Sequence, residues 1–238
     1  MKKQLKFALS GVMLVWSASA LSHTAWLVPV ESNAEGMAQY QVYFGGHEGK
    51  LEGYPAHKVK SINAFNKSGE KLTVWRTMDD DAMQVRAEGT PALLLMHFDN
   101  GIYARTVEGE SVNVPMSEVK DALSAVNAIK YHKSIVQWAD IVTKSHGQPF
   151  EVVPLSASAP KAGKKMKVKV LIEGKAAEGI EIGTGENTSE TKTDENGIAS
   201  YTPKKGFNKL WAGKRSDVSD NPNFTEKSVE YLLTFNAE

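Results

Sequence analysis

Three histidines in this sequence occupy positions where an imidazole could bind a transition metal ion. His23 follows a predicted cleavage site and would lie at or near a new N-terminus. His47 is flanked by glycines, which let a side chain approach a ligand closely, and His97 lies near the end of an apolar run, two residues before Asp99. Alternation along a strand places His97 and Asp99 on one face, where the carboxylate can orient the imidazole. Imidazoles suit Ni(II), Co(II) and Cu(II), so these three histidines are the candidate metal ligands.

The position of His23 depends on how the N-terminal segment is processed. Residues 1–22 have the pattern of a secretory signal peptide, with three early lysines, an apolar stretch and a small-residue cleavage signal that ends at Ala20. Cleavage after Ala20 makes His23 the third residue, whose imidazole joins the amine and two deprotonated backbone amides around square-planar Cu(II) or Ni(II). Cleavage after Ser22 makes His23 the first residue, whose amine and imidazole form a two-toothed chelate. Both cuts are predicted as alternatives.

The composition limits the class of protein. The chain has 238 residues, 28 Lys and Arg against 28 Asp and Glu, and no cysteine. This balance argues against a nucleic-acid-binding protein, and the absence of cysteine excludes disulfides and thiolate metal sites. Removal of the predicted signal peptide takes three lysines and leaves a net charge of −3. No later apolar run is long enough to span a membrane, so we expect no transmembrane segment in the mature chain. A signal peptide on a chain without cysteine predicts a periplasmic protein, with an extracellular destination as the alternative.

Short strands dominate the segments that would position these histidines. The strands expected in the first half of the chain cover residues 26–30, 40–44, 59–65, 72–75, 83–87, 93–98 and 102–107. Asp99, Asn100 and Gly101 predict a hairpin turn between the last two. An amphipathic helix is expected over about 117–142, where apolar residues recur at spacings of three, four or seven. His132 on this helix and His146 after it are expected at the surface.

A change in composition after Pro154 divides the chain. Residues 156–163 are rich in Ser, Ala and Pro, and alternating strands follow from residue 166. We therefore predict a mainly β protein with two Ig-like β-sandwich domains. The signal peptide covers 1–22, an N-terminal β-rich metal-binding domain with one helix covers 23–155, and a C-terminal sandwich covers 156–238. No nucleophile elbow, zinc-protease motif, P-loop or dinucleotide-binding glycine set occurs, so we predict no catalytic residues and no enzymatic activity.

Several segments together resemble a known family. The most specific are the start His23-Thr24-Ala25-Trp26-Leu27-Val28-Pro29 and the run Gln148-Pro149-Phe150-Glu151-Val152-Val153-Pro154, and the loop Gly46-His47-Glu48-Gly49 adds to them. The sequence is similar, over essentially the whole mature chain, to the NikM-type family, whose members are periplasmic, linked to nickel or cobalt uptake and largely catalogued as a domain of unknown function. The resemblance implies metal handling outside the cytoplasm, with His23 and His47 at the matching positions. His97 matches no family motif and remains a candidate from the strand pattern alone.

The predicted function is binding of Ni(II) or Co(II), or of Cu(II), with His23 as the anchor and His47 and His97 as further ligands. His57 or a carboxylate in place of His97 is the alternative for completing the site. The protein would deliver this metal to a membrane metal transporter, since it has no predicted span of its own. Two alternatives remain open. One is a copper-dependent oxygenase built on an N-terminal histidine, which requires cleavage after Ser22. The other is a metal-free sandwich that binds a partner protein or a glycan.

Overall fold

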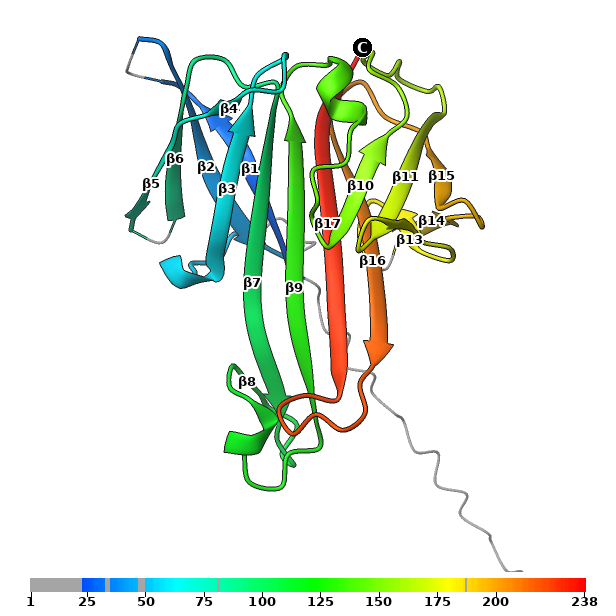
Figure 1. Cartoon of the computed structure of the whole chain (residues 1–238). Coiled ribbons are helices and arrows are strands. Elements are labelled where there is room, and N and C mark those ends of the chain that lie inside the picture. Colours follow the sequence, from blue (N-terminus) through cyan, green and yellow to red (C-terminus); the bar gives the residue numbers. More distant parts are fainter. Residues whose placement is uncertain (1–22, 33–34, 47–49, 81, 187) are drawn as a thin grey trace, which may run out of the picture.

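β-Strands make up almost all of the regular structure (Figure 1). The computed structural model describes residues 23–32, 35–46, 50–80, 82–186 and 188–238. Across these ranges the helical elements are three short 3-10 turns, namely η1 (Ala56–Lys58), η2 (Met116–Glu118) and η3 (Asp140–Thr143). None of them is long and apolar enough to cross a membrane. The prediction of a mainly β protein is confirmed.

The strands form three sheets. The first is antiparallel and four-stranded, in the order β1 (Thr24–Val30), β2 (Met37–Gly45), β6 (Ala82–Glu88), β5 (Val74–Asp79). The second is also four-stranded and comprises β10 (Phe150–Pro154), β11 (Met166–Ile172), β12 (Lys175–Ala176) and β15 (Ile198–Tyr201), with β10, β12 and β15 all pairing with β11. The third has nine strands, in the order β14 (Ser189–Lys192), β13 (Glu181–Gly183), β16 (Gly206–Asp217), β17 (Glu226–Ala237), β9 (Ser124–Ile135), β7 (Leu93–Arg105), β3 (Val59–Phe65), β4 (Lys71–Leu72), with β8 (Ser111–Val112) beside β7.

Four long strands form the centre of the nine-stranded sheet. β7 has 13 residues, and β9, β16 and β17 have 12 each, so each strand is about 40 Å long. β9 and β17 pair in parallel although they lie far apart in the sequence. Figure 1 shows that these four strands continue well past the ends of the two smaller sheets. The far half of the large sheet is therefore not covered by either small sheet.

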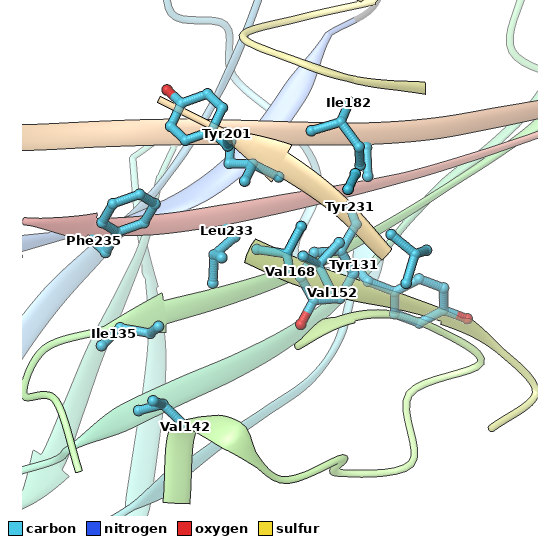
Figure 2. Close-up of a cluster of buried hydrophobic side chains, with 14 of the residues drawn as sticks. Tyr131, Ile135, Val142, Val152, Val168, Ile182, Tyr201, Tyr231, Leu233 and Phe235 are labelled. Carbon is cyan, nitrogen blue, oxygen red and sulfur yellow. The ribbon is translucent and has the colours of Figure 1, made fainter. Parts of the chain in front are cut away.

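The two four-stranded sheets pack on opposite faces of the nine-stranded sheet. Alternate residues of β7 separate the two cores: Leu94 and Met96 pack with the first sheet, whereas Leu93 and Leu95 pack with the second. The larger core, between the nine-stranded sheet and the second sheet, is shown in Figure 2. Its labelled members include Tyr231 of β17, which is fully buried. The covered half of the large sheet is thus buried on both faces.

The nine-stranded sheet joins the two halves of the chain. β3, β4, β7, β8 and β9 precede the boundary predicted at residues 155 and 156, and β13, β14, β16 and β17 follow it. The second sheet also crosses this boundary, because β10 before it pairs with β11 after it. The halves therefore share hydrogen-bonded sheets, and the finer assignment of two Ig-like sandwiches stays a prediction.

The helix predicted over about 117–142 is wrong. This segment forms β9, with the short turns η2 and η3 near the ends of the predicted helix. From Lys130 to Ile135 every residue of β9 is buried, because the strand lies between two layers and pairs with β7 and β17. A strand buried on both faces lacks the apolar–polar alternation that identifies a half-buried strand. The apolar residues of this segment match a helical spacing by coincidence. Pairing with β7 and β17 makes the segment a strand.

The hairpin predicted at residues 99–101 is also wrong. β7 continues through these residues as one strand, and its register with β9 shifts there because Asn100 is an inserted residue. Gly101 adopts φ of +90°, a conformation that residues with a Cβ atom rarely adopt. A tight turn and a β-bulge both use such a glycine, so the local sequence cannot distinguish them.

Candidate metal and ligand cavity

His23 lies directly before β1, at the edge of a cavity on the nine-stranded sheet. Its imidazole stacks on Phe44 of β2, with ring centroids 5.4 Å apart and ring planes 24° apart. Its Nε2 lies 2.7 Å from Oε1 of Glu52, whose backbone N–H donates to the carbonyl of Phe44 at 2.8 Å. An ionised carboxylate only accepts hydrogen bonds, so Glu52 favours the imidazole tautomer with its proton on Nε2. In that tautomer Nδ1 carries the lone pair that can bind a metal.

A buried histidine fixes β1, and with it His23, against the nine-stranded sheet. The backbone N–H of Leu27 in β1 donates to Nε2 of His132 at 3.2 Å. Nδ1 of His132 donates to the carbonyl of Leu232 in β17 at 2.7 Å. Burial lowers the pKa of His132 to about 3, because a charged imidazole would lose its hydration. The surface position expected for His132 is therefore wrong: this residue is a core group that connects three strands.

The cavity beside His23 has a volume of about 570 Å³. His23, Phe44 and Glu52 line one side, and residues of β7, β9, β16 and β17 in the nine-stranded sheet line the other. The sheet contributes small side chains in the central strands, namely Ser124, Val126 and Ala128 of β9 and Ser228 of β17. A hollow of this size, lined by small residues and ringed by polar ones, is typical of a small-molecule site.

The β-bulge in β7 brings polar side chains to this cavity. Before the bulge the even-numbered residues face the cavity side, and Asn100 is the last of them. The inserted residue reverses the alternation, so the odd-numbered Tyr103 and Arg105 line the cavity afterwards. The distortion thus places three polar groups from one strand along the same cavity wall.

Charged groups on β9, β16 and β17 complete the cavity wall. Nζ of Lys130 donates to Glu230 at 3.0 Å, and both side chains are only 6% exposed. Arg215 contacts Glu226 and Glu186 through different nitrogens, each at 2.6 Å. The Lys130–Glu230 and Arg215–Glu226 pairs connect neighbouring strands of the sheet, and each charge has a partner of opposite sign.

The structure places the three predicted ligands differently. His23 lines the cavity, and His47 lies outside the described residues. A Cβ built on Gly46, which precedes His47 in the sequence, would lie 3.9 Å from Nε2 of His23. His97 points to the opposite face of the nine-stranded sheet, where its ring stacks on Tyr131 with centroids 4.8 Å apart. In the part of the chain that the structure describes, no three His, Asp or Glu side chains are close enough together to hold a metal.

The predicted pairing of His97 with Asp99 is only partly seen. The two residues share a face of β7, and burial lowers the pKa of His97 while the charge of Asp99 opposes this effect. The carboxylate of Asp99 lies 3.5 Å from Nζ of Lys60, and that cation lowers the pKa of His97 further. Because His97 and His23 lie on opposite faces of the nine-stranded sheet, the structure does not bring them together.

Sequence reasoning missed most of the cavity. Glu52 contacts His23 across 29 residues of chain, and Lys130 pairs with Glu230 across 100 residues. Arg105 was expected in a hairpin strand, with no role assigned to it. No local pattern marks these residues, because isolated charged residues occur throughout the sequence and their meeting depends on strand order.

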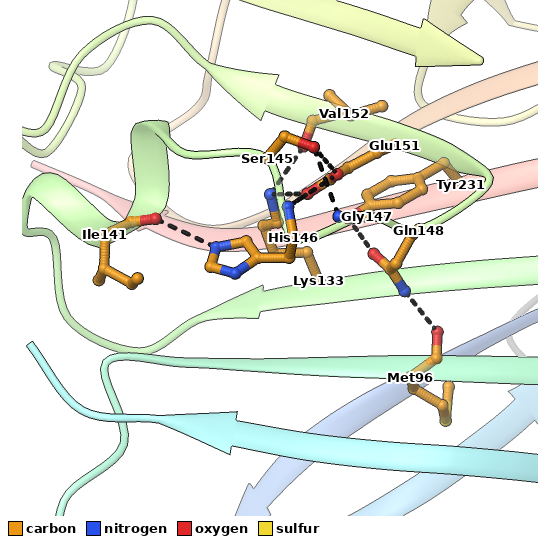
Figure 3. A network of polar contacts seen from close by, with 10 residues as sticks. All are labelled: Met96, Lys133, Ile141, Ser145, His146, Gly147, Gln148, Glu151, Val152 and Tyr231. Carbon is orange, nitrogen blue, oxygen red and sulfur yellow. Dashed lines mark hydrogen bonds and ion pairs between the residues drawn. The ribbon is translucent and has the colours of Figure 1, made fainter. Parts of the chain in front are cut away.

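The motif at residues 148–154 holds a buried ion pair (Figure 3). Nζ of Lys133 lies 3.0 Å from Oε1 of Glu151, and neither side chain is exposed at all. The hydroxyl of Ser145 and the backbone N–H of the half-buried His146 also donate to this carboxylate, at 2.8 and 2.9 Å. Burial raises the pKa of Glu151, but the Lys133 charge and these bonds outweigh it and lower the pKa below its usual value. The motif therefore serves a structural purpose, joining β9 to β10.

The fold and the cavity together define a mainly β protein in which two small sheets flank one large sheet. Residues 20–212 match the family described as "Domain of unknown function (DUF4198)". The chain is also 35% identical over 233 residues to a protein of Haemophilus influenzae described as uncharacterized, and the match covers 98% of each chain. No solved structure matches the sequence. The chain belongs to the DUF4198 family.

Proposed function

We propose that the mature protein binds a late first-row transition metal ion outside the cytoplasm, with His23 as the anchoring ligand. The observation that carries this proposal is the contact between Nε2 of His23 and Glu52, because it assigns the metal-binding lone pair to Nδ1. In both predicted processed forms, Nδ1 is the nitrogen that can close a chelate ring with the backbone nitrogen of the same residue. Metal-bound histidines usually donate the N–H of the other ring nitrogen to a carboxylate, a backbone carbonyl or water, and Glu52 is such a carboxylate.

The proposed donors are mainly backbone and imidazole nitrogens. The backbone amine and deprotonated backbone amides are themselves ligands. The site therefore does not require three clustered side chains. Nitrogen donors in a square-planar arrangement favour Cu(II) and Ni(II), and Co(II) accepts the same ligands with lower affinity. We propose His47 as a further ligand, since its neighbour Gly46 lies beside His23. His97, on the opposite face, is not part of the proposed site.

The proposed role is to carry this metal in the periplasm to a membrane metal transporter. The resemblance to the NikM-type nickel and cobalt uptake family supports this role, as does the signal-peptide pattern of residues 1–22. No catalytic step is assigned to the protein, because binding and release of an ion are sufficient for delivery.

Calorimetry on correctly processed protein tests the metal site. The N-terminal residue is first identified by mass spectrometry, and Ni(II), Co(II) and Cu(II) are then titrated separately. We expect binding tighter than micromolar for at least one ion, and loss of this binding both in His23→Ala and in a form extended by one N-terminal glycine. His57→Ala is the matched control, because His57 is exposed on η1 and outside the cavity.

Glu52→Gln examines the role of the carboxylate. The amide can still contact the imidazole but is a weaker acceptor, so we expect metal affinity to fall about tenfold or more. Undiminished affinity in both His23→Ala and the extended form would show that the metal binds elsewhere. Absence of binding for all three ions would refute metal binding as the function and favour the metal-free interaction module.

A further inference from the structure

The charges around the cavity are not evenly balanced. Each carboxylate that lines it contacts a basic side chain: Glu52 contacts His23, Glu226 contacts Arg215 and Glu230 contacts Lys130. Two cations on the β7 side of the cavity, Lys58 and Arg105, differ from these paired groups. Within the described segments, neither Lys58 nor Arg105 has a carboxylate within 4.0 Å. A carboxylate-bearing ligand would supply the negative charge that this side of the cavity lacks.

Lys58 is the more unusual of these cations because it is buried. The residue is 6% exposed, and its Nζ donates to Oδ1 of Asn100 at 2.9 Å and to the hydroxyl of Tyr103 at 3.0 Å. Both acceptors are neutral, whereas a buried ammonium ordinarily requires a counter-charge. Asn100 and Tyr103 themselves line the cavity, so Lys58 stands one layer behind its wall.

The hydrogen bonds of Lys58 orient Asn100 as a donor to the cavity. The hydroxyl of Tyr103 also donates to Oδ1 of Asn100, at 3.2 Å. Since both bonds use Oδ1, the two N–H groups of Nδ2 remain on the other side of the amide. No hydrogen bond from this nitrogen is found among the described residues. A ligand oxygen in the cavity would be its natural acceptor.

Arg105 provides a second donor at the far end of the same wall. It pairs in register with Ser111 of β8 and Ser124 of β9, and all three residues line the cavity. The guanidinium group binds a carboxylate through two parallel hydrogen bonds, and the serine hydroxyls can add to them. Arg105 pairs with Ser124, and the bulge at Asn100 lies next to Ala128, so about 13 Å of strand separates the two donors.

We propose that this cavity binds a small organic acid with at least two separated carboxylates, one at Arg105 and one at Asn100 in front of Lys58. The spacing favours such a ligand over a compact anion such as phosphate, which cannot reach both donors at once. The volume of about 570 Å³ is sufficient for a molecule of this kind. Binding requires no metal at His23, so this proposal stands or fails independently of the metal site.

Metal-free titration of the processed protein tests the proposal. Protein and buffers are passed over a chelating resin, since soluble chelators such as EDTA are themselves polycarboxylates. Citrate, adipate and inorganic phosphate are then titrated separately by calorimetry. We expect citrate or adipate to bind at submillimolar concentration and phosphate to bind at least about tenfold more weakly, because phosphate engages one donor only.

Two variants locate the binding. Arg105→Gln removes the guanidinium from an exposed position and should weaken binding of the dicarboxylate about tenfold or more, without changing the melting temperature. Lys58→Met removes the buried charge. The folded variant should also bind the dicarboxylate more weakly than wild type. Arg86→Gln, at an exposed position on β6 outside the cavity, is the matched control and should bind normally.

Several results would overturn the proposal. One is no heat from citrate or adipate at millimolar concentration, and another is equal binding of phosphate. Equal affinity in Arg105→Gln and Arg86→Gln would place any bound acid outside this cavity.

Discussion

Acidification should destabilise this protein through His132 before most carboxylates titrate. In the folded protein, Nε2 of His132 accepts the Leu27 N–H, and Nδ1 donates to the Leu232 carbonyl. A second proton would have to occupy Nε2, where it would face the N–H of Leu27 in a site with no access to water. The folded protein therefore keeps this imidazole neutral, and burial holds its pKa at about 3.

The sign and the magnitude follow from proton linkage. In the unfolded chain this imidazole titrates near its ordinary pKa of about 6.5, so below that pH the unfolded state binds more protons than the folded state. The contribution of neutral His132 to stability is complete above pH about 6.5 and is lost as the pH falls towards 3. At pH 5 the difference of about 1.5 pH units corresponds to a loss of about 2 kcal/mol.

Urea unfolding at pH 7.5 and pH 5.0, followed by tryptophan fluorescence, measures this loss. Wild type and His132→Gln are compared, because glutamine retains hydrogen-bonding capacity but does not titrate. Burial also lowers the pKa values of His97 and His146, which destabilises the protein in the same pH window. Both proteins contain these two residues, so their effect cancels in the comparison.

We expect His132→Gln to be less stable than wild type at pH 7.5, and to lose about 2 kcal/mol less on acidification. If the variant loses as much stability as wild type between the two pH values, His132 is not held neutral in the core. The account of how β1 is fixed to β9 and β17 would then be wrong as well.

Two further predictions concern the buried ion pair and the bulge. Glu151→Ala leaves Lys133 buried without its carboxylate and should lower the free energy of unfolding in urea by about 3–5 kcal/mol. The double replacement Lys133→Met with Glu151→Leu removes both charges and should recover much of this loss. An equal cost for both variants would contradict the charge argument. Gly101→Ala adds a Cβ at φ of +90°, 2.9 Å from the side-chain nitrogen of Asn113, and should cost about 1–3 kcal/mol. Gly109→Ala, at φ of +88° with no atom within 4 Å, should cost less, and the reverse order in thermal unfolding would show that the contact is unimportant.

Local sequence patterns were sufficient for much of the secondary structure. The strand expected over 59–65 coincides with β3, and those over 26–30, 40–44 and 83–87 lie within β1, β2 and β6. These strands have β-branched or aromatic residues between clear turn signals, so their neighbours in space are not needed to recognise them. The expected strand over 72–75 is divided between β4 and β5, which belong to different sheets.

The errors lie where two layers cover a strand or where one residue type fits two structures. β9 is buried on both faces, and its buried Lys130, His132 and Lys133 interrupt every simple apolar pattern. Each of these polar residues is satisfied by a partner on another strand. Gly101 supports both a turn and a bulge, and only the pairing of β7 along β9 selects the bulge.

The sequence by itself determined the mainly β class and identified His23 as a candidate ligand, because composition, strand signals and the signal-peptide pattern are local properties of the chain. Tertiary structure alone decided that Glu52 meets His23, that His97 faces away from it, and that Arg105 and Asn100 line one wall of a cavity. The physical reason is that the cavity is formed by the order and register of distant strands. A single inserted residue in β7 changes which side chains face it.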